Sequence, residues 1–320
     1  MTAHGGSDGA MLTTSQIQLA AHPIDPLAPC APGRYADELV MVTREDVPDG
    51  VGGAAAPVVV TAHFALRRRG RRVEVGHWLR PSELDNNVAG LLADELFAPG
   101  WLSGAEIFER VFTGVVRSCV AGAMPAWLTF YTNTLDRIRE CWRAPGQASQ
   151  QGTPIGDFAA IYRRAMRLIP PGRVLDVGSG FGFLPVLLTR RRQSSVIASD
   201  ASPGSIRLLG SLAGALASPL ETLVCDAAQV PLPACSVDTV AAIHLLEHLG
   251  PEHGARALRE AIRLARHRVV VAVPLEDEPT AAYGHLQSFT RADLVRLGRR
   301  QGHRFRVSEH HGGWLVIRTD

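Results

Sequence analysis

The chain has 320 residues, of which 46% are hydrophobic and 20% charged, so a sizeable core can form. The formal net charge of +2 gives no general electrostatic reason to expect nucleic acid as a partner. Every residue of the Lys+Arg count is arginine, because the sequence contains no lysine. Schiff-base chemistry and a phosphate-binding loop with an essential lysine are therefore excluded.

Cysteine usage and the absence of long apolar runs indicate the environment of the protein. The five cysteines are scattered and form no C-x-x-C pair, so we expect neither a disulfide framework nor a zinc site. The start of the sequence lacks the basic residues and apolar block of a signal peptide. No apolar run approaches the ~20 residues that cross a bilayer. These features predict a soluble, cytoplasmic protein without a membrane span.

The first part of the chain combines a tail with a hairpin. Residues 1–34 are rich in Ala, Gly, Pro and Thr, and we expect a flexible tail. Residues 39–43 predict a strand, and residues 58–66 and 71–79 predict a hairpin around the arginine-rich turn 67–70. This turn could resemble a nucleic-acid patch, but no aromatic residues interleave with its arginines. A solvated hairpin tip is the favoured interpretation.

Helical patterns begin at Pro81 and continue to a Pro/Gly/Gln-rich stretch. A first helix is predicted through residues 88–96, and Ser103–Glu106 has the spacing of a capping box before the next helix. A further helix is predicted from 126 toward 142. By composition, residues 146–154 form a linker. This predicts an α+β accessory domain of hairpin plus helices at 35–145 and a catalytic domain at 155–320.

Past the linker, strands alternate with helices, which predicts an α/β fold with a doubly wound, mostly parallel, Rossmann-like sheet. Seven strands are expected, at residues 174–177, 195–200, 221–226, 237–243, 268–274, 304–308 and 313–318. Only a short turn separates the last two, so they should be antiparallel neighbours. A plain dinucleotide-binding fold would instead end in another crossover.

The first of these strands leads directly into a glycine turn. The sequence Asp176-Val-Gly-Ser-Gly-Phe-Gly182 places glycines at 178, 180 and 182 before a helix that starts at Phe183. Glycine allows a backbone to approach a ligand closely, and the helix N-terminus offers unpaired N–H groups. Phe183 occupies the place where a dinucleotide-binding turn has its third glycine. The pattern predicts a nucleotide site of another kind.

Three carboxylates end the first three strands: Asp176, Asp200 and Asp226. The carboxyl ends of neighbouring strands line one crevice in a doubly wound sheet, so these side chains should converge. Any one of them could instead be a helix N-cap. Asp200 is placed to accept hydrogen bonds from both hydroxyls of a ribose. Three such carboxylates suit an adenosine that carries an amino-acid tail.

These features resemble the class I S-adenosylmethionine-dependent methyltransferase family, from about residue 155 to the end of the chain. The first family motif corresponds to Asp176-Val-Gly-Ser-Gly-Phe181-Gly, the ribose acid to Asp200, and the adenine-edge motif to Cys225-Asp226-Ala227. The resemblance implies S-adenosylmethionine as the cofactor. It also implies that the segment after the fourth strand faces the methyl group.

That segment reads His244-Leu-Leu-Glu247-His248. Methyl transfer to an unactivated hydroxyl requires a general base, and histidine is the best-tuned candidate. We favour His248 or His244 as the base, with the two on one helical face, and Glu247 orienting or contacting the acceptor. The alternative is that Glu247 and His248 cap and pack the following helix.

Other histidines and acids also lie where the carboxyl ends of the strands should be. His285 follows the fifth strand, and His310 and His311 lie in the final hairpin turn. The run Glu276-Asp-Glu278 could bind a divalent metal or sugar hydroxyls, but three consecutive acids cannot all face one ion. The segment after the fourth strand also lacks an acidic pair. We therefore expect no metal.

Longer blocks carry a narrower resemblance, to the mycofactocin oligosaccharide methyltransferase family of actinobacteria. The blocks lie at residues 83–92, 95–101, 109–117, 276–285 and 309–314, and the resemblance runs from about residue 35 to the end. It implies O-methylation of a glucose, at the 2-hydroxyl, in the glucan attached to a peptide-derived redox cofactor. The partner would be a glycosylated small-molecule or peptide-derived acceptor. No catalytic residue is carried over from this family.

Three alternatives stay open at this point. The same catalytic domain would serve a methyltransferase that acts on a quinone, phenol or amine. A nicotinamide oxidoreductase is disfavoured by Phe183 and Asp226. The chain could also be an inactive, cofactor-binding partner of a glycosyltransferase.

Overall fold

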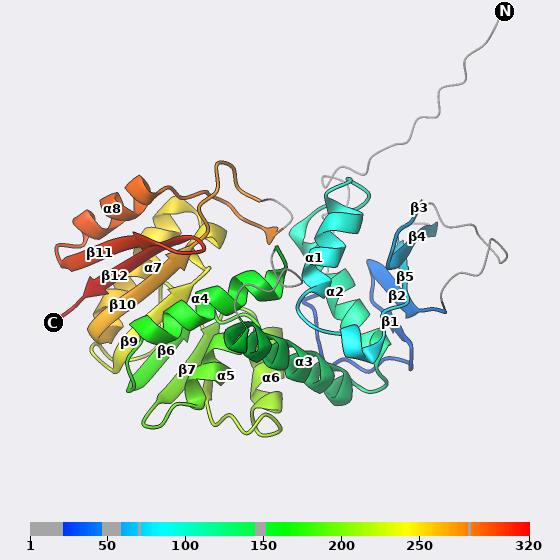
Figure 1. Ribbon diagram of the computed structural model, residues 1–320, viewed down its shortest axis with the longest axis horizontal. Helices are drawn as coiled ribbons and strands as arrows, with labels where there is room; N and C mark the ends of the chain where they lie inside the picture. Colours follow the sequence, from blue (N-terminus) through cyan, green and yellow to red (C-terminus); the bar gives the residue numbers. More distant parts are fainter. Residues whose placement is uncertain (1–21, 47–58, 70–71, 145–151, 281–282) are drawn as a thin grey trace, which may run out of the picture.

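Two sheets at opposite ends of the molecule are joined by helices in a computed structural model of the chain (Figure 1). The structure describes residues 22–46, 59–69, 72–144, 152–280 and 283–320. Within these ranges, no single helix is long and apolar enough to cross a membrane; two helices meet that test only as a pair bent by 103°.

The smaller sheet has the strand order β1-β2-β5-β4-β3. Its strands are β1 (Arg34–Ala36), β2 (Val40–Arg44), β3 (Val59–Val60), β4 (Phe64–Arg69) and β5 (Arg72–His77). The antiparallel pairing of β4 with β5 confirms the predicted hairpin. The predicted strand at 58–66 is instead two strands, because Thr61 and Phe64 bond to each other across a turn and pair β3 with β4.

Helices of the accessory part connect the two sheets. They are η2 (Pro81–Glu83), α1 (Val88–Leu92), the π-helical η3 (Ala93–Phe97), α2 (Ala105–Cys119) and α3 (Ala123–Arg143). The predicted capping box at Ser103 is wrong. Gly104 is the N-cap of α2, with φ of 92° and no side-chain cap, so the chain turns into the helix one residue later than the pattern indicated.

Residues 22–34 are not the tail that composition predicted. The buried guanidinium group of Arg117 donates to the carbonyl oxygens of Pro26 and Ala28, both at 2.8 Å. The indole N–H of Trp127 also donates to Pro26, at 2.8 Å. This segment is therefore fixed against α2 and α3. The remainder of the expected tail, residues 1–21, lies outside the described residues.

The larger sheet has the order β11-β12-β10-β9-β6-β7-β8, with β12 antiparallel to both of its neighbours. This confirms the predicted fold of seven strands ending in a hairpin. The elements are α4 (Pro154–Leu168), β6 (Arg173–Val177), α5 (Phe183–Thr189), β7 (Ser195–Asp200), α6 (Pro203–Ala213), β8 (Glu221–Val224), β9 (Val237–Ile243), η5 (Leu246–His248), α7 (Pro251–Leu264), β10 (Ala265–Val273), α8 (Arg291–Arg300), β11 (Arg304–Glu309) and β12 (Gly313–Arg318).

Both faces of this sheet are buried, which explains its continuous apolar strands. Val269 and Val271 of β10 pack in a cluster with side chains of α7 and α8. Val270 and Ala272, which alternate with them, pack on the opposite face with side chains of α4 and α5. The sheet is therefore held rigidly between two helical layers.

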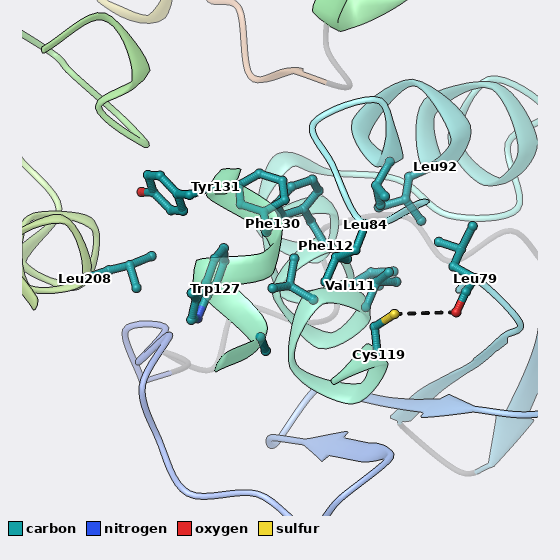
Figure 2. Close-up of a cluster of buried hydrophobic side chains, with 14 of the residues drawn as sticks. Leu79, Leu84, Leu92, Val111, Phe112, Cys119, Trp127, Phe130, Tyr131 and Leu208 are labelled. Carbon is teal, nitrogen blue, oxygen red and sulfur yellow. Dashed lines mark hydrogen bonds between the residues drawn. The ribbon is translucent and has the colours of Figure 1, made fainter. Parts of the chain in front are cut away.

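One hydrophobic core crosses the predicted domain boundary. Phe112 of α2 and Trp127 and Phe130 of α3 belong to the same buried cluster as Phe183 of α5 and Leu208 of α6. Figure 2 shows Leu208 next to the aromatic side chains of this cluster. The expected linker covers residues 146–154, of which 146–151 lie outside the described residues. The accessory helices therefore pack directly on the catalytic sheet layer.

We expect Gly114→Ala to destabilise the protein, because a Cβ atom there would lie 2.3 Å from Cγ2 of the buried Val42. Overpacking of this kind costs about 1–3 kcal/mol. The matched control is Gly214→Ala, where nothing lies within 4 Å of the added atom. Urea unfolding measures both variants. Equal stability of the two alanine variants would contradict the tight α2–β2 contact.

Candidate functional site

A cavity of ≈ 670 Å³ opens where β6, β7, β8 and β9 end. Its sheet-side wall carries Gly178 and Gly180, Asp200, Asp226 and His244, each at the carboxyl end of a different strand or just after it. The opposite wall comes from α2, α3 and the segment near Pro26. Its volume lies within the range of about 300–1,000 Å³ that is usual for small-molecule sites.

The three glycines of the turn after β6 differ in their surroundings. All have positive φ: 71° at Gly178, 52° at Gly180 and 72° at Gly182. An added Cβ would lie 2.6 Å from Leu245 at Gly178 and 2.4 Å from Leu209 at Gly182, whereas nothing lies within 4 Å at Gly180. Gly178 and Gly180 line the cavity, while Gly182 packs the start of α5.

Asp200 is fixed at the cavity wall by two backbone N–H groups. Its Oδ2 accepts from Gly180 at 2.9 Å and its Oδ1 accepts from Ser202 at 2.8 Å. Each carboxylate oxygen keeps a second lone pair, and the side chain remains partly accessible. Asp200 can therefore accept further hydrogen bonds from a ligand in the cavity.

Asp176 lies deeper than the sequence suggested. Its side chain is only 4% exposed, and it lies in β6, behind the glycine turn. Burial raises the pKa of Asp176 to about 8, and the nearby charge of Asp200 adds to the rise. Asp200 and Asp226 both line the cavity, as expected. Asp176 does not line it, because its side chain is buried in β6 behind the glycine turn.

Asp226 and Ala227 also line the cavity. Oδ1 of Asp226 accepts from the backbone of Ala228 at 2.8 Å and contacts Nε2 of His253 at 2.7 Å. The Ala228 N–H, and after it His253, lower the pKa of Asp226. His253 lies in α7 and belongs to no motif, so it could not be found from sequence.

Phe181 connects the glycine turn to the accessory helices. Its carbonyl oxygen accepts from the Tyr131 hydroxyl at 2.6 Å. Its ring lies 5.4 Å from the rings of both Phe112 and Phe130, measured between centroids. Phe181 lines the cavity as predicted, although its ring is held within an aromatic cluster. The partners of this cluster were not predicted.

Glu109 of α2 is a second residue that sequence reasoning missed. It keeps accessible surface because it borders the open cavity, together with Phe108, Phe112 and Thr113 of the same helix. Burial by the cavity walls raises the pKa of Glu109, and the charge of Asp200 raises it further. Glu109 is the first residue of the sequence block 109–117. Its place in this block was the one feature of the sequence that could have pointed to it.

His244 and His248 both line the cavity, but they do not share a helical face. His244 has a φ of 55°, and only the single 3₁₀ turn η5 follows it. The predicted helical spacing is therefore wrong. A left-handed backbone at a non-glycine residue is strained, as is common at functional sites.

Glu247 is fully buried behind these two histidines. Its Oε1 lies 3.1 Å from Nδ1 of His244. Among the described residues, neither Glu247 oxygen nor Nε2 of His244 has a hydrogen-bond partner. Burial lowers the pKa of His248 below its ordinary value, against the opposing effect of Glu247.

His285 approaches this group from the loop after β10. Its ring lies 4.9 Å from the ring of His248, and its Nδ1 lies 2.8 Å from Oε2 of Glu276. One potential ligand atom each from Glu247, His248 and His285 lies within 4.8 Å of the others. His310 and His311 lie in the turn between β11 and β12 and are not part of the cavity wall.

Comparison with protein families identifies one matching segment. Residues 174–268, which run from β6 into β10, match the family described as methyltransferase domain. No curated protein matches the chain.

Three solved structures illustrate the partial similarity of the fold, and two of them are methyltransferases. An S-adenosylmethionine-dependent methyltransferase from Aquifex aeolicus is 17% identical, with a TM-score of 0.42, over 57% of this chain and 96% of its own. The PH0226 protein from Pyrococcus horikoshii is 15% identical, with a TM-score of 0.44, over 56% and 97%. Magnesium protoporphyrin IX methyltransferase from Synechocystis, solved with bound cofactor, is 18% identical, with a TM-score of 0.40, over 58% and 95%.

The residues at the cavity fit the cofactor of that family. Open space at Gly180 permits close approach of a ligand, and Asp200 offers free lone pairs to ribose hydroxyls. Asp226 and Ala227 add a carboxylate and a small side chain to the wall of the same cavity. Residues 174–268 match a methyltransferase domain and lie in a seven-stranded sheet with the strand order of the class I methyltransferase fold, and S-adenosylmethionine is the cofactor that this match supports.

Proposed function

We propose that the protein is an O-methyltransferase that acts on a sugar hydroxyl, with the 2-hydroxyl of a glucose in the mycofactocin oligosaccharide as the acceptor. One observation carries the proposal: His244 and His248 line the same cavity as Gly180 and Asp200. Proton-accepting groups and the cofactor site therefore share one enclosed space. An unactivated hydroxyl needs such a group, whereas an acceptor that is already a nucleophile does not.

The residues of the catalytic domain would bind and orient the cofactor. Asp200 would accept from the ribose hydroxyls, Asp226 and Ala227 would bind the adenine edge, and Asp176 would favour the cationic amino-acid end. The cofactor supplies an activated methyl group that an acceptor oxygen takes up as the carbon–sulfur bond breaks and its electron pair stays on sulfur. The chain has only to position the two and remove the acceptor proton.

The accessory helices would bind the acceptor. Asn86, Glu109 and Thr113 place polar groups on the wall opposite the sheet, and Phe108 and Phe112 add aromatic surface. Carboxylates, amides and hydroxyls bond sugar hydroxyls, while an aromatic face suits the apolar face of a sugar ring. Two of the sequence blocks that carry the mycofactocin resemblance, 83–92 and 109–117, supply residues of this wall. This supports an acceptor-specific role for the blocks.

Methylation of the sugar is the central expected outcome. Purified protein, S-adenosylmethionine and glycosylated mycofactocin should yield a product with one methyl group on a glucose, located by tandem mass spectrometry. His248→Ala and His244→Asn should each lower kcat by ~10²–10⁴-fold, as loss of acid–base assistance does. Asparagine is chosen at 244 because it tolerates the positive φ.

The exposed His303 provides a matched control, and His303→Ala should retain full activity. Methylation of a phenol, quinone or amine panel with no reaction at the sugar would show that the acceptor class is wrong. Absence of transfer to any acceptor by a protein that binds the cofactor would instead favour a non-catalytic partner.

Asp200→Asn should weaken binding of S-adenosylmethionine and of S-adenosylhomocysteine alike. Hydrogen bonds to a charged group contribute about 1.5–3 kcal/mol, so Kd should rise by about 10- to 150-fold. Isothermal titration calorimetry measures both ligands. Asp136→Asn, on the exposed surface of α3, is the matched control and should bind normally. An unchanged Kd in Asp200→Asn would show that Asp200 does not bind the ribose hydroxyls.

Asp176→Asn should stabilise the cofactor-free protein at neutral pH while weakening cofactor binding. The folded pKa of about 8 lies above the ordinary value of 3.8, so unfolding releases a proton between these pH values. The stability of the natural protein should therefore fall as pH rises from about 4 to 8, and the variant should lack this loss.

At pH 7 the variant should be more stable by at least about 1 kcal/mol, or ~2–4 °C in Tm. Differential scanning calorimetry across this pH range, with and without S-adenosylmethionine, is the measurement. A variant with the same pH dependence as the natural protein would show that Asp176 is ionised in the folded state.

A further inference from the structure

Glu247 is a buried carboxylate with too few hydrogen bonds and positive charges around it to offset the cost of its burial. Its side chain has 0% exposure, and within the described part of the chain neither oxygen has a hydrogen-bond partner. Its one close polar contact is Nδ1 of His244, at 3.1 Å. A buried carboxylate is costly unless it is paired, hydrogen-bonded or bound to a metal ion. This environment therefore calls for a cation.

His248 and His285 place ring nitrogens beside this carboxylate. One ligand atom from each of the three side chains lies within 4.8 Å of the other two. The side chain of His285 is only 8% exposed, and Nδ1 lies 2.8 Å from Oε2 of Glu276. An N–H at Nδ1 that donates to this carboxylate leaves Nε2 with a free lone pair, which is the usual arrangement around a metal-binding histidine.

Further contacts hold these orienting groups in place. Oε1 of Glu276 accepts from the Thr280 hydroxyl at 3.0 Å, so both carboxylate oxygens are used. The carboxylate of Glu276 thus fixes the ring of His285, as supporting groups do in metal sites.

The loop that carries His285 is tied to the turn that carries Glu247 and His248. The backbone N–H groups of Leu286 and Gln287 donate to the Glu247 carbonyl oxygen, at 2.7 and 3.3 Å. The side chain of Gln287 donates to the carbonyl oxygens of Leu246 and Leu249, at 3.0 and 2.7 Å. Four hydrogen bonds therefore keep the three ligand groups together although they come from two separate segments.

We propose that Glu247, His248 and His285 bind a divalent transition-metal ion. Two imidazoles and one carboxylate suit ions such as Mn²⁺, Co²⁺ or Zn²⁺, and three protein ligands leave coordination positions open. This assignment replaces the expectation of a metal-free site that the sequence supported. The sequence pattern hid the site because His285 lies 37 residues beyond His248 and is brought back by the fold.

The role of the ion rests on the proposed sugar methylation. His248 lines the cavity, so an acceptor there reaches the ion from that side. Two neighbouring hydroxyls of a sugar can occupy adjacent open positions, which would orient the ring. The ion lowers the pKa of a bound hydroxyl, whose proton then passes to water in the cavity. His248 is then a ligand, because its lone pair cannot serve as both ligand and base.

The test measures metal binding directly, in the full chain without a histidine tag. MnCl₂ titration by calorimetry and the visible absorption of added Co²⁺ report affinity and ligand geometry. We expect one ion per chain. Glu247→Gln and His285→Ala should weaken binding by more than about 100-fold, and Glu276→Gln by about 10- to 100-fold, the usual effect of an orienting partner.

Two exposed residues supply matched controls, His303→Ala and Glu252→Gln, and both should bind like the natural protein. Circular dichroism and S-adenosylmethionine titration verify that each variant is folded. Absence of saturable binding of Mn²⁺, Co²⁺ and Zn²⁺ overturns the proposal. Equal loss in His303→Ala and His285→Ala overturns it as well, because the binding would then be nonspecific.

The same experiment separates this proposal from the proposed function. Specific metal binding without methylation of any sugar would leave the metal site in place and reject the acceptor. Undiminished sugar methylation by protein that retains no metal after EDTA treatment would reject the metal site and leave the acceptor in place.

Discussion

The hydrogen bond from the Tyr131 hydroxyl to the Phe181 carbonyl oxygen joins the cofactor turn to the accessory helices. The turn has three residues with positive φ, a conformation that glycine adopts readily. On its other side, Gly180 donates to Asp200. The turn is therefore held from α3 and from β7 at once. These two hydrogen bonds link the wall assigned to the acceptor with the wall assigned to the cofactor.

Carboxyl groups gather at this cavity before any ligand binds. Burial, and after it the charge of Asp200, raises the pKa values of both Asp176 and Glu109. Glu247, at the neighbouring strand end, is buried with little compensation. Such arrangements reduce the stability of the free protein. They are understandable if cations complete them: the sulfonium and amino groups of the cofactor at the first cluster, and a metal ion at the second.

The central strands of the larger sheet, β6, β7, β9 and β10, could be predicted from sequence because they are mostly apolar and buried on both faces. The residues opposite it could not. The helical pattern of α2 shows a buried face but not that Glu109 and Phe112 face Asp200 and Phe181. The segment around Pro26 is held through backbone carbonyl oxygens, which leave no trace in composition. The depth of Asp176 and the approach of His285 likewise depend on how distant segments pack.

The core that runs from α2 and α3 into α5 and α6 affects how this protein can diversify. Because aromatic side chains of both parts pack in one core, replacing the first half of the chain by that of another protein would require this core to be repacked. If α2 binds the acceptor as proposed, a change of acceptor would be more accessible through single replacements on its cavity side, where Glu109 and Thr113 line the cavity. Natural selection and laboratory evolution for a new acceptor would then both favour substitutions on this surface of α2.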